Sequence, residues 1–222
     1  MADPRDLDGT EDADEIDGTA GDDLIRGFAG NDTLRGGAGD DTYRIDAAAD
    51  RIVETVGNGF DVVRATAQVT LGAAEIEAVA LEGAGNLRVT GNAFATEITG
   101  NAGSNILVGG GGGDTLTGGA GNDFFAFQLS DAAGAVTVTD FGAGDKLALD
   151  DRIFGLGDRG IDPRAVTAQQ AASALRSEAF SYNRNTGELL VDLDARGGPR
   201  DPILIAVIEG GVPIGQEDVL LF

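Results

Sequence analysis

Aspartate residues recur at intervals of nine, each at a fixed distance behind two glycines. Three consecutive units, GTAGDDLIR, GFAGNDTLR and GGAGDDTYR, begin at Gly18, Gly27 and Gly36. Each unit has Gly at positions 1 and 4, Asp at position 6 and an apolar residue at position 8. Glycine permits backbone angles that a β-carbon forbids, so main-chain carbonyls can point at a common centre. Carboxylates combined with carbonyls form an all-oxygen ligand set, which suits a hard cation such as Ca²⁺.

The same frame returns from Gly91, and it yields candidate ligands in both blocks. The position-6 candidates are Asp14, Asp23, Asp32, Asp41 and Asp50, then Asn105, Asp114 and Asp123, with Asp61 in a shifted frame. The glycines expected to contribute carbonyls are Gly18, Gly27, Gly36, Gly109 and Gly118. A plain turn explains Asp14 and Asp50 equally well, and Thr96 indicates a weak or lost site. Asp140 and Asp145 either complete a site at the end of the repeats or belong to a surface turn.

Two units make one coil of 18 residues, so residues two units apart stack on the same side. The stacking predicts one row of Asp14, Asp32 and Asp50, a second of Asp23 and Asp41, and the pairs Asn105 with Asp123 and Thr96 with Asp114. Carboxylates ~5 Å apart repel by about 3 kcal/mol at an effective dielectric near 20. A dication bound between the carboxylates makes the net interaction attractive. Calcium accepts six to eight oxygens in loose geometry, whereas Mg²⁺ demands a tight octahedron and Zn²⁺ and Cu²⁺ prefer nitrogen or sulfur.

The repeated pattern resembles the nonapeptide of the RTX (hemolysin-type calcium-binding) family over about a third of the chain. The resemblance implies an all-β fold, a parallel β-roll or β-solenoid whose position-8 side chains point inward. It also implies a protein of Gram-negative bacteria that binds several Ca²⁺ ions, folds outside the cell and leaves it by type I secretion.

The pattern divides the chain into three parts. Residues 1–8 are a tail, and residues 9–126 form the roll, with repeats at 9–53 and 91–126 and a diverged solenoid at 54–90. Residues 127–222 lack the repeat and are expected to form a C-terminal cap of strands with one short helix at 163–176. The segment 139–150 resembles the cap that follows RTX repeats. The acidic-then-apolar end, 217–222, resembles an uncleaved secretion signal, although a plain terminal strand explains it equally well.

The net charge of −23, from 38 acidic and 15 basic residues, argues against nucleic acid and anionic membranes as partners. No apolar run is long enough to span a membrane, and the acidic N-terminus does not fit a cleavable signal peptide. The chain lacks both His and Cys, so HExxH and Ser-His-Asp sites are impossible and no enzymatic activity is expected.

Other functions stay open beside calcium-dependent folding and export. One is an extracellular carbohydrate-binding, adhesin or surface-layer module with a glycan or protein partner. Another is an accessory fragment of a larger secreted enzyme or toxin. The sequence shows neither the aromatic platform nor the basic groove that glycan binding needs.

Overall fold

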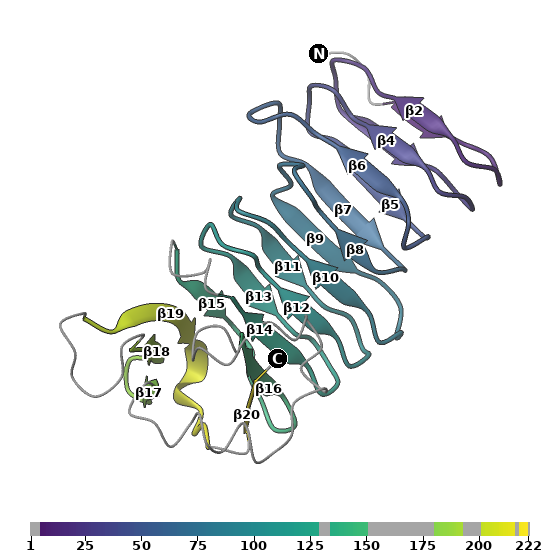
Figure 1. Ribbon diagram of the computed structural model, residues 1–222. Coiled ribbons are helices and arrows are strands. Elements are labelled where there is room, and N and C mark those ends of the chain that lie inside the picture. The colour runs from purple at the N-terminus through teal and green to yellow at the C-terminus, as the bar shows by residue number, and fades with distance from the viewer. Residues whose placement is uncertain (1–4, 129–133, 151–179, 193–200, 216–217, 222) are drawn as a thin grey trace.

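The chain forms an all-β, parallel β-solenoid of about eight turns, seen in a computed structural model (Figure 1). The structure describes residues 5–128, 134–150, 180–192, 201–215 and 218–221. Successive coils stack from the N-terminus toward strands β17 to β19 at the opposite end. The parallel β-roll expected from the nine-residue period is therefore confirmed.

Odd-numbered strands together with β18 form one continuous sheet, and the other even-numbered strands form two sheets on the other face. The long sheet contains, in spatial order, β1 (Arg5–Asp8), β3 (Asp23–Arg26), β5 (Thr42–Ile45), β7 (Val62–Ala65), β9 (Ala78–Leu81), β11 (Glu97–Thr99), β13 (Thr115–Thr117), β15 (Val136–Val138), β19 (Ile203–Ile208), β18 (Glu188–Val191) and β17 (Phe180–Asn183). The three-stranded sheet contains β2 (Glu15–Asp17), β4 (Thr33–Arg35) and β6 (Arg51–Val53). The six-stranded sheet contains β8 (Val69–Thr70), β10 (Arg88–Thr90), β12 (Ile106–Val108), β14 (Phe124–Phe127), β16 (Lys146–Leu149) and β20 (Val219–Leu221).

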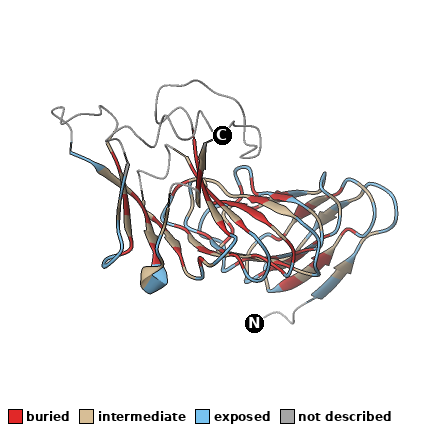
Figure 2. Cartoon of the chain, turned by 90° about the horizontal axis from the view of Figure 1, so that it is seen from below, coloured by how far each residue is buried: buried red, intermediate tan, exposed pale blue. Residues whose placement is uncertain are grey.

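The position-8 side chains build the core. Stacked coils place them in register, as in the pairs Ile25 with Tyr43 and Leu107 with Phe125. All of them from the second nine-residue unit onward are buried: Ile25, Leu34, Tyr43, Ile52, Ile98, Leu107, Leu116 and Phe125. Each such burial contributes about 1.5–3 kcal/mol. Buried residues accordingly run along the inside of the roll (Figure 2).

The solenoid continues through residues 54–90, where the repeat is weak. Strands β7, β8, β9 and β10 lie between the two repeat blocks, and Val63 and Val79 are buried in register with the position-8 residues. The even-numbered face is interrupted here, because β6 pairs with β4 and β8 pairs with β10. The long sheet alone therefore connects the two blocks by continuous strand pairing.

Parallel stacking also extends beyond residue 126. Strand β15 pairs with β13, and β16 pairs with β14. Strands β19 and β20 then pair in parallel with β15 and β16. The hairpin of β17 and β18 adds to β19 in antiparallel orientation and ends the long sheet. The helix expected at 163–176 lies outside the described residues. A 3₁₀ turn at Glu209–Gly211 follows β19.

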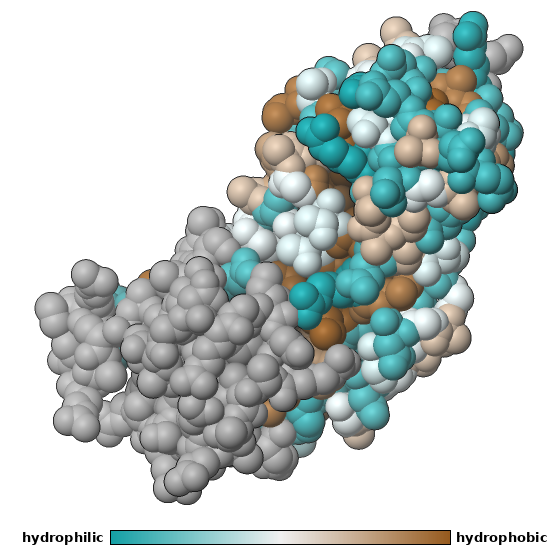
Figure 3. All heavy atoms as spheres, turned by 45° about the vertical axis from the view of Figure 1, so that its right-hand side comes forward, coloured by the Kyte–Doolittle hydropathy of each residue, from teal (hydrophilic) through white to brown (hydrophobic). Residues whose placement is uncertain are grey.

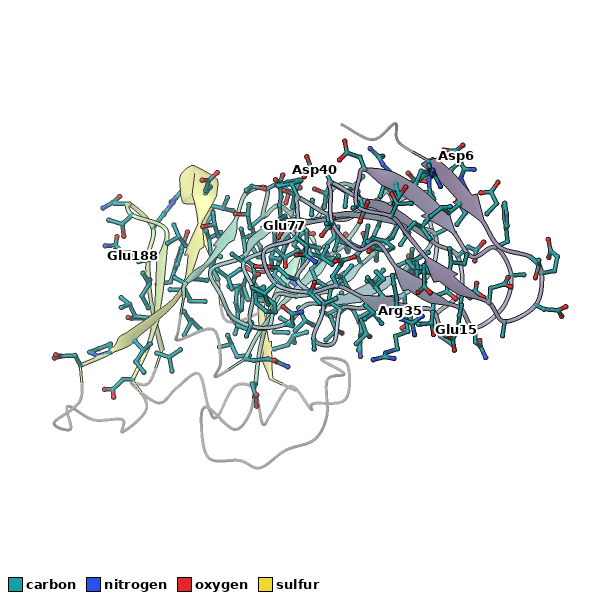
Figure 4. All side chains as sticks on the ribbon, turned by 90° about the horizontal axis from the view of Figure 1, so that it is seen from above. Asp6, Glu15, Arg35, Asp40, Glu77 and Glu188 are labelled. Carbon is teal, nitrogen blue, oxygen red and sulfur yellow. The ribbon has the colours of Figure 1, made fainter. Side chains whose placement is uncertain are left out.

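Charged side chains cover the outside of the N-terminal coils. Arg35 contacts Glu15 and Asp17 across neighbouring strands at 3.3 and 3.1 Å (Figure 4). Hydrophilic residues dominate the visible face of these coils (Figure 3). Such exposed pairs contribute little stability each, so the fold depends on its core and on the turns.

We expect Leu107→Ala to lower the free energy of unfolding by about 2–5 kcal/mol, because it opens a cavity under β12. The exposed Val56 is the matched control, and Val56→Ala should change stability by less than about 0.5 kcal/mol. Urea unfolding at saturating calcium measures both. Equal losses for the two variants would contradict the assignment of the core.

Candidate calcium sites

Position 6 of one coil is hydrogen-bonded to position 6 of the next coil. The N–H of Asp14 donates to Oδ1 of Asp32 at 2.9 Å, and the N–H of Asp23 donates to Oδ1 of Asp41 at 2.8 Å. The same bond joins Asp32 to Asp50, Thr96 to Asp114 and Asn105 to Asp123. The structure therefore brings together every row that the 18-residue stacking predicts.

Two of these rows are longer than the repeat indicates. The N–H of Asp41 donates to Asp61 Oδ1, and the N–H of Asp61 donates to Glu77 Oε2 at 2.7 Å. In the second block the N–H of Asp123 donates to Asp145 Oδ1 at 2.8 Å. The successive separations are 20, 16 and 22 residues, so the ladder survives insertions and deletions that disrupt the nine-residue frame.

The turns before position 6 adopt two conformations. In the open turns, 27–32, 36–41, 109–114 and 118–123, the backbone has positive φ at positions 2 and 4. In the closed turns, 9–14, 18–23, 91–96 and 100–105, neither position does. Position 2 of an open turn is Gly37, Gly110, Gly119 or Phe28, and Phe28 is the one non-glycine with positive φ (62°) among the described residues. Each block thus has two closed turns followed by two open turns.

Closed turns satisfy the position-6 side chain from within the repeat. The N–H of Thr10 donates to Asp14 Oδ2 at 2.6 Å, and the N–H of Thr19 donates to Asp23 Oδ2 at 2.6 Å. The N–H of Asn101 likewise donates to Oδ1 of Asn105 at 2.8 Å. These side chains already have a protein partner where a cation would bind.

Three of the four open turns bury the second carboxylate oxygen without a hydrogen-bond partner. Oδ2 of Asp32, Asp41 and Asp114 is buried and unpartnered, and each of these residues is 1% exposed. A buried carboxylate oxygen without a partner is strongly unfavourable, so each of these atoms calls for a cation. Asp23 Oδ1 is unpartnered as well. The N–H of Arg5, in the neighbouring strand β1, donates to the carbonyl of Asp22 rather than to this oxygen.

Backbone carbonyls approach the same places through the position-1 glycines. The carbonyl oxygen of Gly36 lies 2.0 Å from where a β-carbon of Gly18 would stand, and that of Gly118 lies 2.2 Å from the equivalent point at Gly100. Oδ2 of Asp32 and Asp114 fills the β-carbon positions of Gly27 and Gly109, at 2.0 and 2.1 Å. Position 1 must therefore be glycine, because an oxygen occupies the space of its side chain.

The raised pKa values of acids in the rows indicate that these buried carboxylates lack a positively charged partner. Burial raises the pKa of Asp41, Asp114 and Asp123 to about 6, and burial together with neighbouring acids raises the pKa of Asp61 to about 7. Burial also raises the pKa of Asp50. A bound dication would favour the ionised carboxylates that burial disfavours.

Three other predicted ligands have both carboxylate oxygens engaged by N–H groups. Asp50 accepts from Asp32 and Ala47. Asp140 accepts from Gly118 and Gly119, both at 2.8 Å. Asp145 accepts from Asp123 and Gly142. These acids hold turns in place, whether or not they also contact an ion.

Sequence reasoning missed Glu54 and Glu77. Glu54 is buried and stands 18 residues after Gly36, so its place in the frame could have identified it. Glu77 lies 16 residues after Asp61, outside any nine-residue register, and no pattern pointed to it.

Side chains alone do not complete a site. Among the described residues, no three His, Cys, Asp or Glu side chains group closely enough to hold a metal ion. Any ion in the rows therefore needs backbone carbonyls or water as well. Oxygen-only ligands of this mixed kind suit Ca²⁺.

A family profile described as the RTX calcium-binding nonapeptide repeat matches residues 8–43 and 90–125, in four copies. The matched segments contain all the open and closed turns described above, and the rows continue beyond them to Asp50, Asp61, Glu77 and Asp145. These are RTX calcium-binding repeats. The RTX repeats bind several Ca²⁺ ions and make the chain a calcium-binding β-roll, an architecture that is structural rather than typically catalytic. A comparison with curated proteins gave no match. In the described part of the chain, no helix is long and apolar enough to cross a membrane.

We expect Asp32→Ala to raise the calcium midpoint of folding more than Asp14→Ala. Asp32 lies between two coils of its row and has an unpartnered Oδ2, whereas Asp14 lies in the terminal coil and its Oδ2 accepts from Thr10. Circular dichroism during calcium titration measures the two midpoints. Equal shifts would mean that open and closed turns contribute alike.

The metal-free fold should become more stable as the pH falls through about 7 to 5. The folded-state pKa values of Asp41, Asp61 and Asp114 lie above the unfolded value, so protons bind the metal-free fold more tightly than the unfolded chain. In chelator, the fold should therefore gain stability on acidification and lose it as the pH rises through these values. The unfolded chain and the calcium-bound fold both carry these carboxylates ionised in this range, so the calcium midpoint of folding from the unfolded chain should change little between pH 7 and 5. Circular dichroism in chelator and in calcium titrations at several pH values measures both effects, and a metal-free stability that does not respond to pH would refute the coupling.

Proposed function

We propose that this chain is a calcium-dependent folding module that is exported unfolded by a type I system and folds outside the cell. Three unpartnered carboxylate oxygens, on Asp32, Asp41 and Asp114, carry the proposal. Without cations, the rows place like charges next to each other in a buried setting, so the folded state is disfavoured. Where calcium is scarce the chain stays extended and can thread a channel, and where calcium is abundant it folds.

In chelator, the far-ultraviolet circular dichroism spectrum should be that of a largely disordered chain. Millimolar Ca²⁺ should produce a β spectrum with steep dependence on concentration, because binding free energy is here folding free energy. Magnesium at the same concentration is the control and should leave the chain disordered. A thermally stable fold in chelator near neutral pH would contradict the proposal.

The end of the chain supports the proposal that it contains an export signal, which is read before the chain folds. In the folded structure β20 pairs with β16, and Val219 is buried at 1% exposure. Asp218 also accepts a hydrogen bond from Lys146 at 2.9 Å. A signal built from these residues is accessible only while the chain is unfolded, which agrees with export ahead of calcium binding.

Deleting residues 219–222 should abolish type I secretion, while calcium-induced folding persists with a modestly higher midpoint. Leu147→Ala is the matched control, since Leu147 is the register partner of Val219 and its loss weakens the same packing without changing the tail. Secretion is measured in a host that carries a type I transporter. If the deletion variant is exported normally, residues 219–222 are a terminal strand and not an export signal.

A second candidate function, glycan or carboxylate binding, is favoured by one feature that the sequence did not reveal. Arg26, Arg44 and Arg64 stand in register across β3, β5 and β7. They line a hollow of about 280 Å³ together with Phe28, which is 39% exposed. These arginines lie 18 and 20 residues apart in the sequence and come together only when the coils stack, so the sequence alone did not group them.

This hollow also holds acidic groups, which limits its attraction for anions. Glu82 contacts both Arg44 and Arg64, at 2.7 and 3.5 Å, and Asp46 contributes to the lining. Binding of oligouronates, with neutral oligosaccharides as controls, tests this candidate at saturating calcium. Arg44→Gln should lower the affinity at least about tenfold if the hollow is used, because it removes the central guanidinium.

A further inference from the structure

The first repeat block ends in an arrangement that the nonapeptide does not contain. Glu54 stands where the next position-1 glycine would be, and its Oε1 accepts from the N–H groups of Gly36 and Gly37 at 3.0 and 3.4 Å. Inside a block, the corresponding N–H bonds to a strand carbonyl, as Gly18 does to Arg35. A carboxylate has thus replaced backbone oxygen at the end of the block.

Oxygen atoms converge at Gly36 as they do at the other position-1 glycines. Around its β-carbon position lie Asp41 Oδ2 at 2.0 Å, the Tyr43 hydroxyl at 2.3 Å and Glu54 Oε1 at 2.6 Å. At Gly9 the equivalent pair is Asp14 Oδ2 and the carbonyl oxygen of Gly27, each at 2.7 Å. Glu54 therefore supplies a charged oxygen where interior coils supply a neutral one.

The charge of this group is not balanced by protein. Asp41 and Glu54 are 1% and 8% exposed, and no ion pair among the described residues includes either of them. Their hydrogen-bond donors are neutral N–H groups and the Tyr43 hydroxyl, which donates to Glu54. Asp41 Oδ2 has no partner at all. Two neighbouring buried carboxylates with only dipolar partners are stabilised in the ionised form by a bound cation.

We propose that Glu54 is a further calcium ligand, which together with Asp41 forms a site of higher charge at the end of the first block, directly beside Tyr43. The inference rests on the calcium-dependent folding proposed above. The remaining ligands that calcium needs are backbone carbonyls and water. Because carboxylate replaces carbonyl, this site binds more tightly than the interior sites and fills first.

The second block ends in the same way with different side chains. Asp140 accepts from Gly118 and Gly119 as Glu54 does from Gly36 and Gly37. Near Gly118 lie Asp123 Oδ2 at 2.5 Å and the ring of Phe125 at 3.0 Å, so Phe125 takes the place of Tyr43. This equivalence provides a matched pair in which only the first block carries a phenol.

Terbium(III), which replaces calcium and emits when a nearby tyrosine is excited, reports on this site. The chain has two Tyr residues and no Trp, so few side chains can sensitise emission. Tyr43→Phe should abolish the emission while saturating calcium still folds the chain. Tyr182→Phe is the control and should leave the emission intact, because Tyr182 bonds to Val212 in the C-terminal region. Adding Phe125→Tyr to Tyr43→Phe should restore emission at the end of the second block.

Glu54→Gln keeps the size of the side chain and one acceptor oxygen for the N–H groups of Gly36 and Gly37, but removes its charge. We expect it to raise the terbium midpoint of Tyr43-sensitised emission at least about tenfold, while saturating calcium still folds the chain. Asp140→Asn is the matched control and should not shift that midpoint. If Glu54→Gln fails to fold, Glu54→Asp serves as the test variant. Its terbium midpoint should lie between the wild-type value and a tenfold increase.

An unchanged terbium midpoint in the folded Glu54 variant would overturn the inference and leave Glu54 as a turn-closing residue. Emission that persists in Tyr43→Phe would overturn it as well. Neither result would contradict calcium-dependent folding. That proposal fails only if the circular dichroism of the wild-type chain does not change on adding calcium or terbium.

Discussion

The burial of carboxylates without protein counter-charge is the constraint on which the rest of the structure depends. Side chains in an extended strand alternate, so positions 6 and 8 point to the same side of the chain. The geometry that buries Leu34 and Leu116 therefore also draws Asp32 and Asp114 inward. A roll with this core cannot place its position-6 acids in solvent. The apolar core and the cation requirement are two results of one strand geometry.

The backbone decides which of these acids remain available to an ion. With positive φ at position 2, as in Gly37 and Gly110, the second carboxylate oxygen of the repeat has no N–H partner. With Thr19 at that position, the N–H caps the carboxylate instead. Phe28 adopts the positive-φ conformation at a cost of roughly 1–2 kcal/mol, so its turn keeps the open form despite an unsuitable residue. Such strain persists where surrounding structure dictates the backbone, here the stacked coils on either side.

The sequence predicted the solenoid, the buried position-8 residues and the pairing of the acid rows, because all three depend on one period. It did not separate Asp14 and Asp23 from Asp32 and Asp41, since all four share position 6 and differ in their turns. Position 2 separates them, because it is Thr before Asp14 and Asp23 but Phe28 and Gly37 before Asp32 and Asp41. Glu77 and the pairing of β19 with β15 could not be predicted. They follow from coil lengths that depart from 18 residues and from contacts between segments far apart in the chain.

The long sheet joins the two repeat blocks by continuous strand pairing. Each position-6 bond joins two coils, so an ion held in one turn also fixes the coil before it. These bonds continue past the first block through Asp61 to Glu77, and the strand pairing of the long sheet continues through β7 and β9 to β11. The break between β6 and β8 is confined to the opposite face, so it does not isolate the blocks. Ion binding in the open turns of one block therefore stabilises the diverged coils, which offer the next block an edge on which to stack. Calcium-driven folding should consequently be more cooperative than two separate blocks would allow, because the coils without repeats transmit order between those that have them.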